Sequence, residues 1–109
     1  MISSEHFVSA LDARYLEINN KEEFDAAINN GRYAYLHIKC NIRLKDIYKK
    51  IGDNVSSWDV SACTDMSWMF RNCYEFNSDL SAWDASACAD MRCMFKNCNL
   101  PDDKKPQKI

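Results

Sequence analysis

The chain has 109 residues and a net charge of −2 at neutral pH. A chain of this length forms one small domain with a thin core, and its mild acidity argues against a nucleic-acid-binding module. No apolar run approaches the roughly 20 residues of a membrane span, and residues 1–10 lack the basic start and apolar stretch of a signal peptide. We therefore expect a cytoplasmic protein.

The first 31 residues predict a helical N-terminal cap. A first helix is expected over residues 3–15, where apolar side chains recur at helical spacing. A second helix should begin after Asn20, because Asn20 and Glu23 have the spacing of a capping box. It should end near Gly31, which stands where a left-handed C-cap is needed. The apolar face of this second helix is formed by Phe24, Ala27 and Ile28.

A degenerate first repeat is predicted at residues 32–54. Residues 32–40 alternate between apolar and polar side chains, as in a strand with one buried face. After this strand, apolar residues at positions i, i+3, i+4 and i+7 indicate one face of a helix, namely Leu44, Ile47, Tyr48 and Ile51. The same apolar spacing returns 22 positions later at Met66, Met69, Phe70 and Cys73.

Residues 55–79 and 80–100 carry one pattern twice. The matching residues lie 25 positions apart, a period that is typical of a solenoid; the pairs are Trp58 and Trp83, Asp59 and Asp84, Cys63 and Cys88, Met66 and Met91, and Phe70 and Phe95. Each copy begins with a short segment without strong helix formers, which favours a strand. A helix face follows, so each repeat is predicted to contain a strand, a turn, a helix and a return loop.

The second copy carries a family resemblance. Residues 76–86 read Phe-Asn-Ser-Asp-Leu-Ser-Ala-Trp-Asp-Ala-Ser, and Asp90-Met91 and Met94-Phe95 follow. This pattern resembles the repeat of the BspA-like leucine-rich-repeat surface proteins, and short phage and prophage members of that kind look similar to this chain. The resemblance implies a right-handed leucine-rich-repeat-like solenoid that binds other molecules, and it implies no catalytic residues.

The expected fold is thus an α/β (α+β) solenoid, a short leucine-rich-repeat-like stack with a helical N-terminal cap. Terminal units of such stacks are atypical because one side of each faces water. Residues 101–109 form a polar tail without a following strand. The last repeat should therefore present an open face and a strand edge, through which a homodimer could form.

The six cysteines have three interpretations. Cys63 recurs at Cys88 and Cys73 at Cys98, as expected if a small apolar residue fills each repeat. Disulfides and a metal site are the alternatives, but no export signal and no Cys-x-x-Cys pair occurs. We favour the core interpretation and expect no metal and no cofactor. Cys93 aligns with Trp68 and is the thiol most expected at the surface.

The predicted partner-binding residues combine an aromatic ring, acidic positions and flanking groups. Trp68 lies off the apolar face, so it either anchors an interface or packs on the return loop at residues 74–76. The recurring aspartates either stabilise turns or form an acidic stripe for a basic partner. The two histidines, His6 and His37, have no partnering motif and are expected at the surface. The full set of partner-binding candidates is Trp68, Asp59, Asp84, Asp65, Asp90, Arg71 and Cys93.

These observations favour a non-enzymatic protein–protein interaction module. A phage- or prophage-encoded inhibitor of a host defence protein, such as a CRISPR effector, is a specific form of this hypothesis. The alternatives are a structural homo-oligomer, a cell-surface adhesion-type repeat protein and an enzyme. The enzyme is disfavoured because the sequence contains no phosphate loop, metal motif or nucleophile–base arrangement. We expect a protein partner, no direct contact with nucleic acid and no membrane association.

Overall fold

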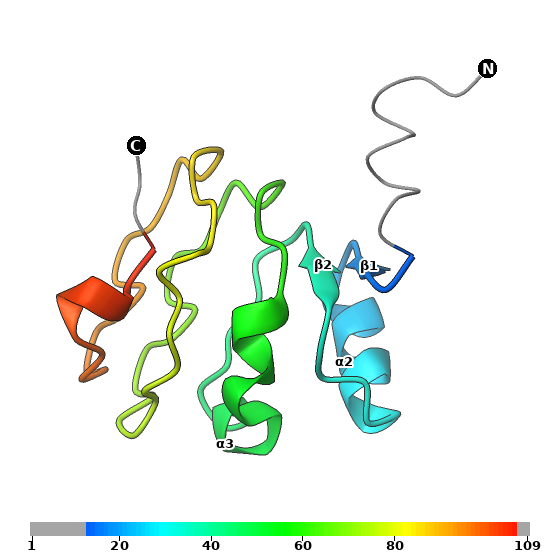
Figure 1. Cartoon of the computed structure of the whole chain (residues 1–109), viewed down its shortest axis with the longest axis horizontal. Coiled ribbons are helices and arrows are strands. Elements are labelled where there is room, and N and C mark those ends of the chain that lie inside the picture. Colours follow the sequence, from blue (N-terminus) through cyan, green and yellow to red (C-terminus); the bar gives the residue numbers. More distant parts are fainter. Residues whose placement is uncertain (1–12, 107–109) are drawn as a thin grey trace.

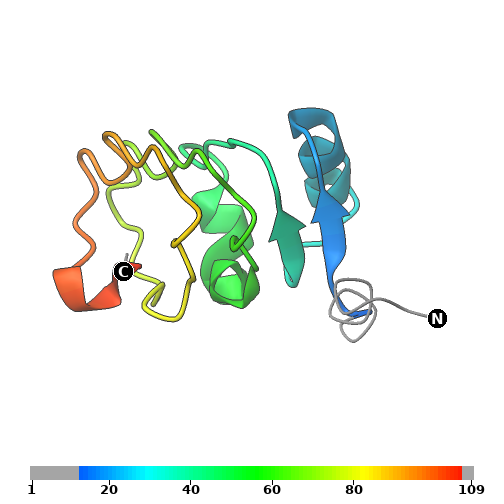
Figure 2. The same ribbon diagram turned by 90° about the horizontal axis from the view of Figure 1, so that it is seen from above.

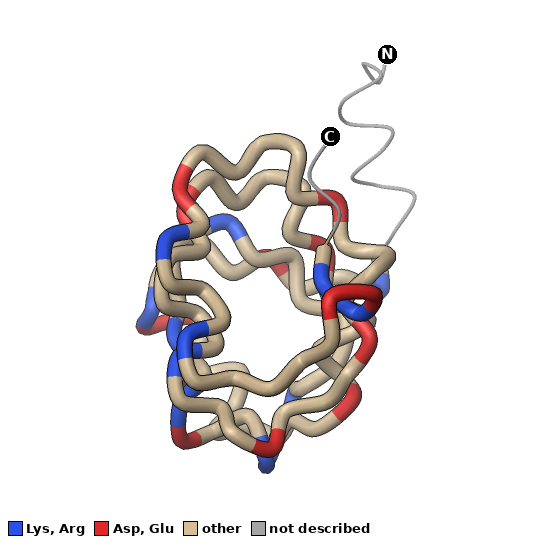
Figure 3. The backbone as a smooth tube through the Cα atoms, turned by 90° about the vertical axis from the view of Figure 1, so that its left-hand side faces the viewer, with Lys and Arg blue, Asp and Glu red and all other residues tan. Residues whose placement is uncertain are grey.

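The structure is a computed structural model that describes residues 13–106. The chain advances along its long axis in successive turns that lie side by side, from the N-terminal region at one end to the C-terminal region at the other (Figure 1). The same order is seen from above (Figure 2). Viewed from the C-terminal end, the turns overlie one another around a common axis (Figure 3). None of the helices within the described residues is long and apolar enough to cross a membrane.

The first turn contains β1 (Leu16–Ile18), α2 (Lys21–Asn29) and β2 (Leu36–Ile38). The two strands pair in parallel, with Glu17 opposite His37. The predicted capping of α2 is confirmed, since the Asn20 side chain accepts a hydrogen bond of 2.8 Å from the N–H of Glu23. Gly31 has a φ of 77°, as expected of a left-handed C-cap. The predicted apolar face of α2 is buried.

The N-terminal cap differs from the expectation in one respect. It contributes the strand β1, which pairs with the edge of β2, so it is not purely helical. The first predicted helix falls mostly outside the described residues; residues 13–15, which are described, are not helical. The strand predicted over residues 32–40 is shorter than expected, because Tyr35 has a φ of 57° that interrupts the extended backbone just before β2.

The next turn pairs with the first at the predicted spacing. His37 and Asp59, which are 22 positions apart, form a parallel bridge. The helical segment between them is shorter than predicted, with only α3 (Tyr48–Ile51) in α conformation. The 3₁₀ helix η1 (Gly52–Ser57) follows directly, so the segment from Val55 that was predicted as a strand becomes extended only at Trp58.

The helices predicted within the two repeats are wrong. Residues 66–73 form β-turns closed by N–H to C=O hydrogen bonds, from Met69 to Met66 at 3.3 Å and from Cys73 to Phe70 at 3.1 Å. The third residue of each turn, Trp68 or Asn72, has a positive φ of 65° or 62°, the signature of a type II turn. Residues 91–98 repeat the arrangement, with positive φ at Cys93 and Asn97.

Hydrogen bonding between neighbouring turns explains why no helix forms there. Alternate N–H groups of the repeat at residues 55–79 donate to carbonyl groups of the repeat at residues 80–100 at 2.8–3.0 Å. The bonds run from Met66 to Asp90, Trp68 to Arg92, Phe70 to Met94 and Asn72 to Lys96. An N–H that crosses to a neighbouring turn cannot donate to the carbonyl four residues back, as an α-helix requires. The Asn97 side chain also donates to that of Asn72 at 2.9 Å, which ties these two left-handed positions together.

The core runs along the whole stack and contains apolar residues that recur between the repeats. Met66, Met69, Phe70 and Cys73 are buried even though they do not lie on a helix. Trp58 and Trp83 are buried and stacked with their ring centroids 6.5 Å apart. Their indole N–H groups donate to the carbonyls of Tyr33 at 2.6 Å and Val55 at 3.2 Å, which satisfies both donors inside the core.

The C-terminal segment packs against the last repeat. Leu100 is buried, and the 3₁₀ helix η2 (Asp102–Lys104) follows it. The Leu80 N–H donates to the Lys104 carbonyl at 2.7 Å, and the Lys104 ammonium donates to the Asn77 carbonyl at 3.1 Å. Residues 100–105 therefore begin to cover the end of the stack near residues 77–80.

Candidate binding surface

Trp68 and Arg71 form the centre of the candidate surface. The positive φ of Trp68 turns its ring off the buried face, so the indole is half-buried while its neighbour Met69 is fully buried. Arg71 follows three residues later in the sequence and places its guanidinium carbon 4.9 Å from the centre of the Trp68 ring. This distance is that of a cation–π contact. The arrangement leaves a flat, amphipathic shelf at the surface.

Two further cations reach this shelf from the preceding turn. Arg43 and Lys45 line a hollow of about 120 Å³ together with Trp68, Arg71 and Asn72. The segment that carries them is held by the Leu44 N–H, which donates to the Met69 carbonyl at 2.8 Å. We call Arg43, Lys45, Trp68 and Arg71 the Trp68 face. It joins residues that are more than 20 positions apart in the sequence.

The positive charge of the Trp68 face is offset only in part within the molecule, because Arg43 is among the groups that lower the pKa of Asp65. Arg43, Lys45 and Arg71 are exposed, and none of them forms an ion pair with another residue between positions 13 and 106. When the molecule is viewed from its C-terminal end, lysine and arginine gather along one side, and most acidic residues lie elsewhere around the stack (Figure 3). A surface of this kind attracts negative charge.

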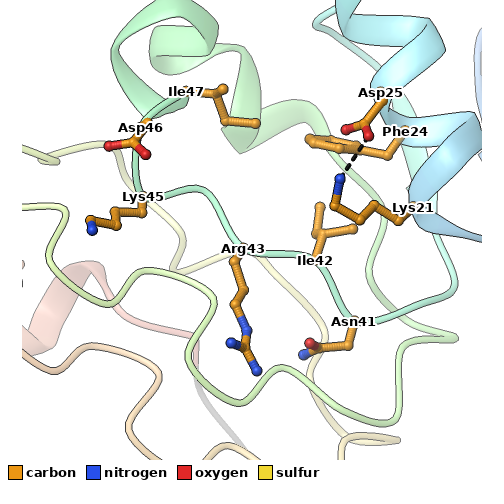
Figure 4. A pocket seen from close by; sticks show the side chains of 9 residues that line it. All are labelled: Lys21, Phe24, Asp25, Asn41, Ile42, Arg43, Lys45, Asp46 and Ile47. Carbon is orange, nitrogen blue, oxygen red and sulfur yellow. Dashed lines mark hydrogen bonds and ion pairs between the residues drawn. The ribbon is translucent and has the colours of Figure 1, made fainter.

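A groove lies on the other side of Arg43 and Lys45. It has a volume of about 560 Å³ and separates α2 from the segment that leads into α3 (Figure 4). Its apolar lining comes from Phe24 and Ile42, which are buried, and from Ile47, which is half-buried. On the α2 side, the rim is an ion pair of 2.7 Å between Lys21 and Asp25. The remaining lining residues are Asn41, Arg43, Lys45 and Asp46.

Comparison with known proteins assigns the chain to a family. Residues 39–104 match the model of a family described as Mycoplasma protein of unknown function, DUF285. The chain belongs to this DUF285 family. No curated protein and no solved structure matches the chain. The whole Trp68 face lies within the match, whereas the α2 wall of the groove lies outside it.

The predicted acidic positions of this DUF285 chain act as turn residues. In each case a carboxylate oxygen accepts the backbone N–H two residues later at 2.9–3.0 Å; the residues are Asp59, Asp65, Asp84 and Asp90. The Ser67 hydroxyl and N–H lower the pKa of Asp65, and those of Ser86 lower the pKa of Asp84. Hydrogen bonds of this kind stabilise turns, which was one of the two interpretations of the aspartates.

Three of the aspartates take part in bridges between neighbouring turns. Asp65 and Asp90 lie side by side in a parallel bridge. Asp59 is bridged to His37 of the preceding turn, and its carboxylate lies 3.9 Å from the imidazole Nε2. His37, which was expected at the surface, is half-buried: its side chain is 24% exposed, and its Nε2 is buried without a hydrogen-bond partner among the described residues. His6 lies outside the described residues.

The cysteines occupy the positions expected of core residues. Cys63, Cys73 and Cys88 are buried free thiols, and Cys40, Cys93 and Cys98 are half-buried. Burial raises the pKa of Cys63 to about 11 and that of Cys73 to about 12. Within residues 13–106, no group of histidine, cysteine and acidic side chains is placed to hold a metal ion. Cys93 has a positive φ of 55°, as its alignment with Trp68 requires.

Trp68 and Arg71 are predicted from the sequence, whereas the residues that complete the surface are not. Arg43 and Lys45 flank Leu44, which belongs to the predicted apolar helix face. Two exposed cations on either side of a buried residue are a weak signal of a basic edge. The groove had no signal of its own, because its walls come from α2 and from a segment that lies about 20 positions later.

Proposed function

We propose that this chain is a non-enzymatic protein–protein interaction module built as a short leucine-rich-repeat-like solenoid of the BspA-like kind. The solenoid interpretation is supported by backbone hydrogen bonds that recur between turns at the repeat spacing. It is also supported by aromatic residues that stack at that spacing, since Phe70 and Phe95 lie 5.5 Å apart with their rings nearly parallel. Solenoids present extended binding surfaces.

The observation that carries the proposal is the stacking of Arg71 on the half-buried Trp68, beside two cations that lack ion-pair partners among the described residues. Tryptophan and arginine are the residues most enriched at the energetic centres of protein interfaces. The partner is therefore a protein with an acidic surface. An inhibitor of a host defence protein is a narrower form of this proposal, and within it an acidic patch on the defence protein would be the target.

The test is capture of a partner from a lysate of the source cell by the immobilised chain and by its Trp68→Ala/Arg71→Ala variant. We expect the variant to capture the partner at least about tenfold more weakly, because loss of an interface anchor costs 2 kcal/mol or more. The matched control is Tyr74→Ala, since Tyr74 is 58% exposed and outside the Trp68 face. Equal capture by the Trp68→Ala/Arg71→Ala variant, with an unchanged circular dichroism spectrum, would refute the proposal.

Self-association is the second candidate function, and a row of N–H groups without acceptors among the described residues favours it. In the repeat at residues 55–79, alternate N–H groups donate to the carbonyls of the next repeat. The N–H groups at the matching positions of the repeat at residues 80–100 donate no hydrogen bond within residues 13–106; these positions are Met91, Cys93, Phe95 and Asn97. A row that contains only donors cannot pair with its own copy. Self-association would then be head to tail, and light scattering would show a mass that grows with concentration instead of a closed dimer.

A further inference from the structure

We propose that the groove beside α2 and the Trp68 face together bind one extended acidic segment of the partner protein, with a large apolar side chain seated in the groove. This inference deepens the proposed function and rests on it. It assigns the chemistry of the partner segment, which neither the family match nor the repeat pattern supplies.

The groove and the Trp68 face are continuous. Arg43 and Lys45 line both the groove of about 560 Å³ and the hollow of about 120 Å³ at Trp68. The two cations therefore form a ridge with an apolar recess on one side and an aromatic shelf on the other. A single segment of chain laid across the ridge would contact all three features.

The apolar recess can hold one side chain of the partner. The side chains of Ile47, Phe24 and Ile42 border the space between α2 and the loop (Figure 4). The recess is large enough for one Leu- or Phe-sized side chain with part of its backbone, because ligand sites typically span a few hundred to 1,000 Å³. Burying such a side chain releases water from apolar surface on both partners.

The groove and the Trp68 face carry mainly positive unpaired charge. Lys21 is paired with Asp25 at 2.7 Å on the α2 side of the rim, so its charge is already offset. Arg43, Lys45 and Arg71 have no such partner among the described residues, and the one unpaired acidic residue in the lining is Asp46. Charge complementarity therefore favours aspartate or glutamate close to the apolar anchor, and it disfavours a basic segment.

The experiment is selection of a displayed library of random linear peptides against the folded chain. We expect enriched peptides to contain one large apolar residue within about four positions of two or more acidic residues. No enrichment, or enrichment of basic peptides, would overturn the inference. A labelled oligothymidylate is tested in parallel, and saturable binding of that probe at the same surface would also overturn it, because a basic and aromatic surface can bind single strands.

Affinity measurements on one enriched peptide locate the site. Replacing its apolar residue with alanine should weaken binding about tenfold or more, as expected for the loss of a buried side chain. Lys45→Glu should weaken binding by a similar factor, whereas Lys50→Glu should not. Lys50 is a matched control because it is an exposed lysine on α3 outside the groove. Equal loss with both variants would assign binding to net charge and refute the site.

The two proposals fail in different ways. If capture from the lysate depends on Trp68 but no acidic peptide is enriched, the binding function stands and the assignment of the groove is wrong. If capture does not depend on Trp68 or Arg71, the proposed function itself is wrong.

Discussion

Replacing Phe70 with alanine is expected to lower the free energy of unfolding by about 3–5 kcal/mol. Phe70 is fully buried at the centre of the stack. The centroid of its ring lies 4.4 Å from that of Phe76, 5.5 Å from that of Phe95 and 5.9 Å from that of Trp83. Phe76 lies in the same repeat as Phe70, whereas Phe95 and Trp83 lie in the next repeat, so removal of the ring leaves a cavity between two repeats.

The change can be measured by urea denaturation followed through tryptophan fluorescence. Tyr74→Ala is the control, because Tyr74 is 58% exposed and its loss should alter stability by no more than about 0.5 kcal/mol. A loss at Phe70 as small as that at Tyr74 would mean that the ring is not packed between turns. The structure of the core would then be wrong at its centre.

Alkaline pH is expected to destabilise the protein through its buried thiols. Burial raises the pKa of Cys63 from 9.0 to about 11 and that of Cys73 from 9.0 to about 12. The folded state thus holds the two protons more tightly than the unfolded state does. The resulting stabilisation is complete below pH 9 and is lost as the pH rises through 11 and 12. By pH 10 the loss should be about 1.4 kcal/mol for each thiol.

Urea denaturation at several pH values between 7 and 10.5, under reducing conditions, measures this loss. The Cys63→Ala/Cys73→Ala variant is the comparison, since it lacks both thiols. We expect it to be less stable than the wild type at pH 7 but to lose less stability as the pH rises. Identical slopes for the two proteins would show that these thiols are not the groups that titrate.

The sequence alone determined which residues form the core and how far apart the repeats lie. The 25-residue period placed Trp58 against Trp83 and Phe70 against Phe95, and both pairs stack. It also determined α2, whose cap and apolar face are local features. These predictions succeeded because burial follows from the spacing of apolar side chains, and because capping depends on residues within one turn of the helix end.

Only the tertiary structure decided the conformation of the repeats and the make-up of the Trp68 face. A helix and a series of β-turns can bury the same residues at i, i+3, i+4 and i+7, so the apolar pattern of residues 66–73 did not distinguish them. The two conformations differ in whether an N–H donates to a carbonyl of its own repeat or to one of the neighbouring repeat. The conformation therefore depends on a carbonyl 24 positions away, as between Met66 and Asp90. For the same reason, Arg43 lies beside Trp68 only because the repeats that carry them stack in the tertiary structure.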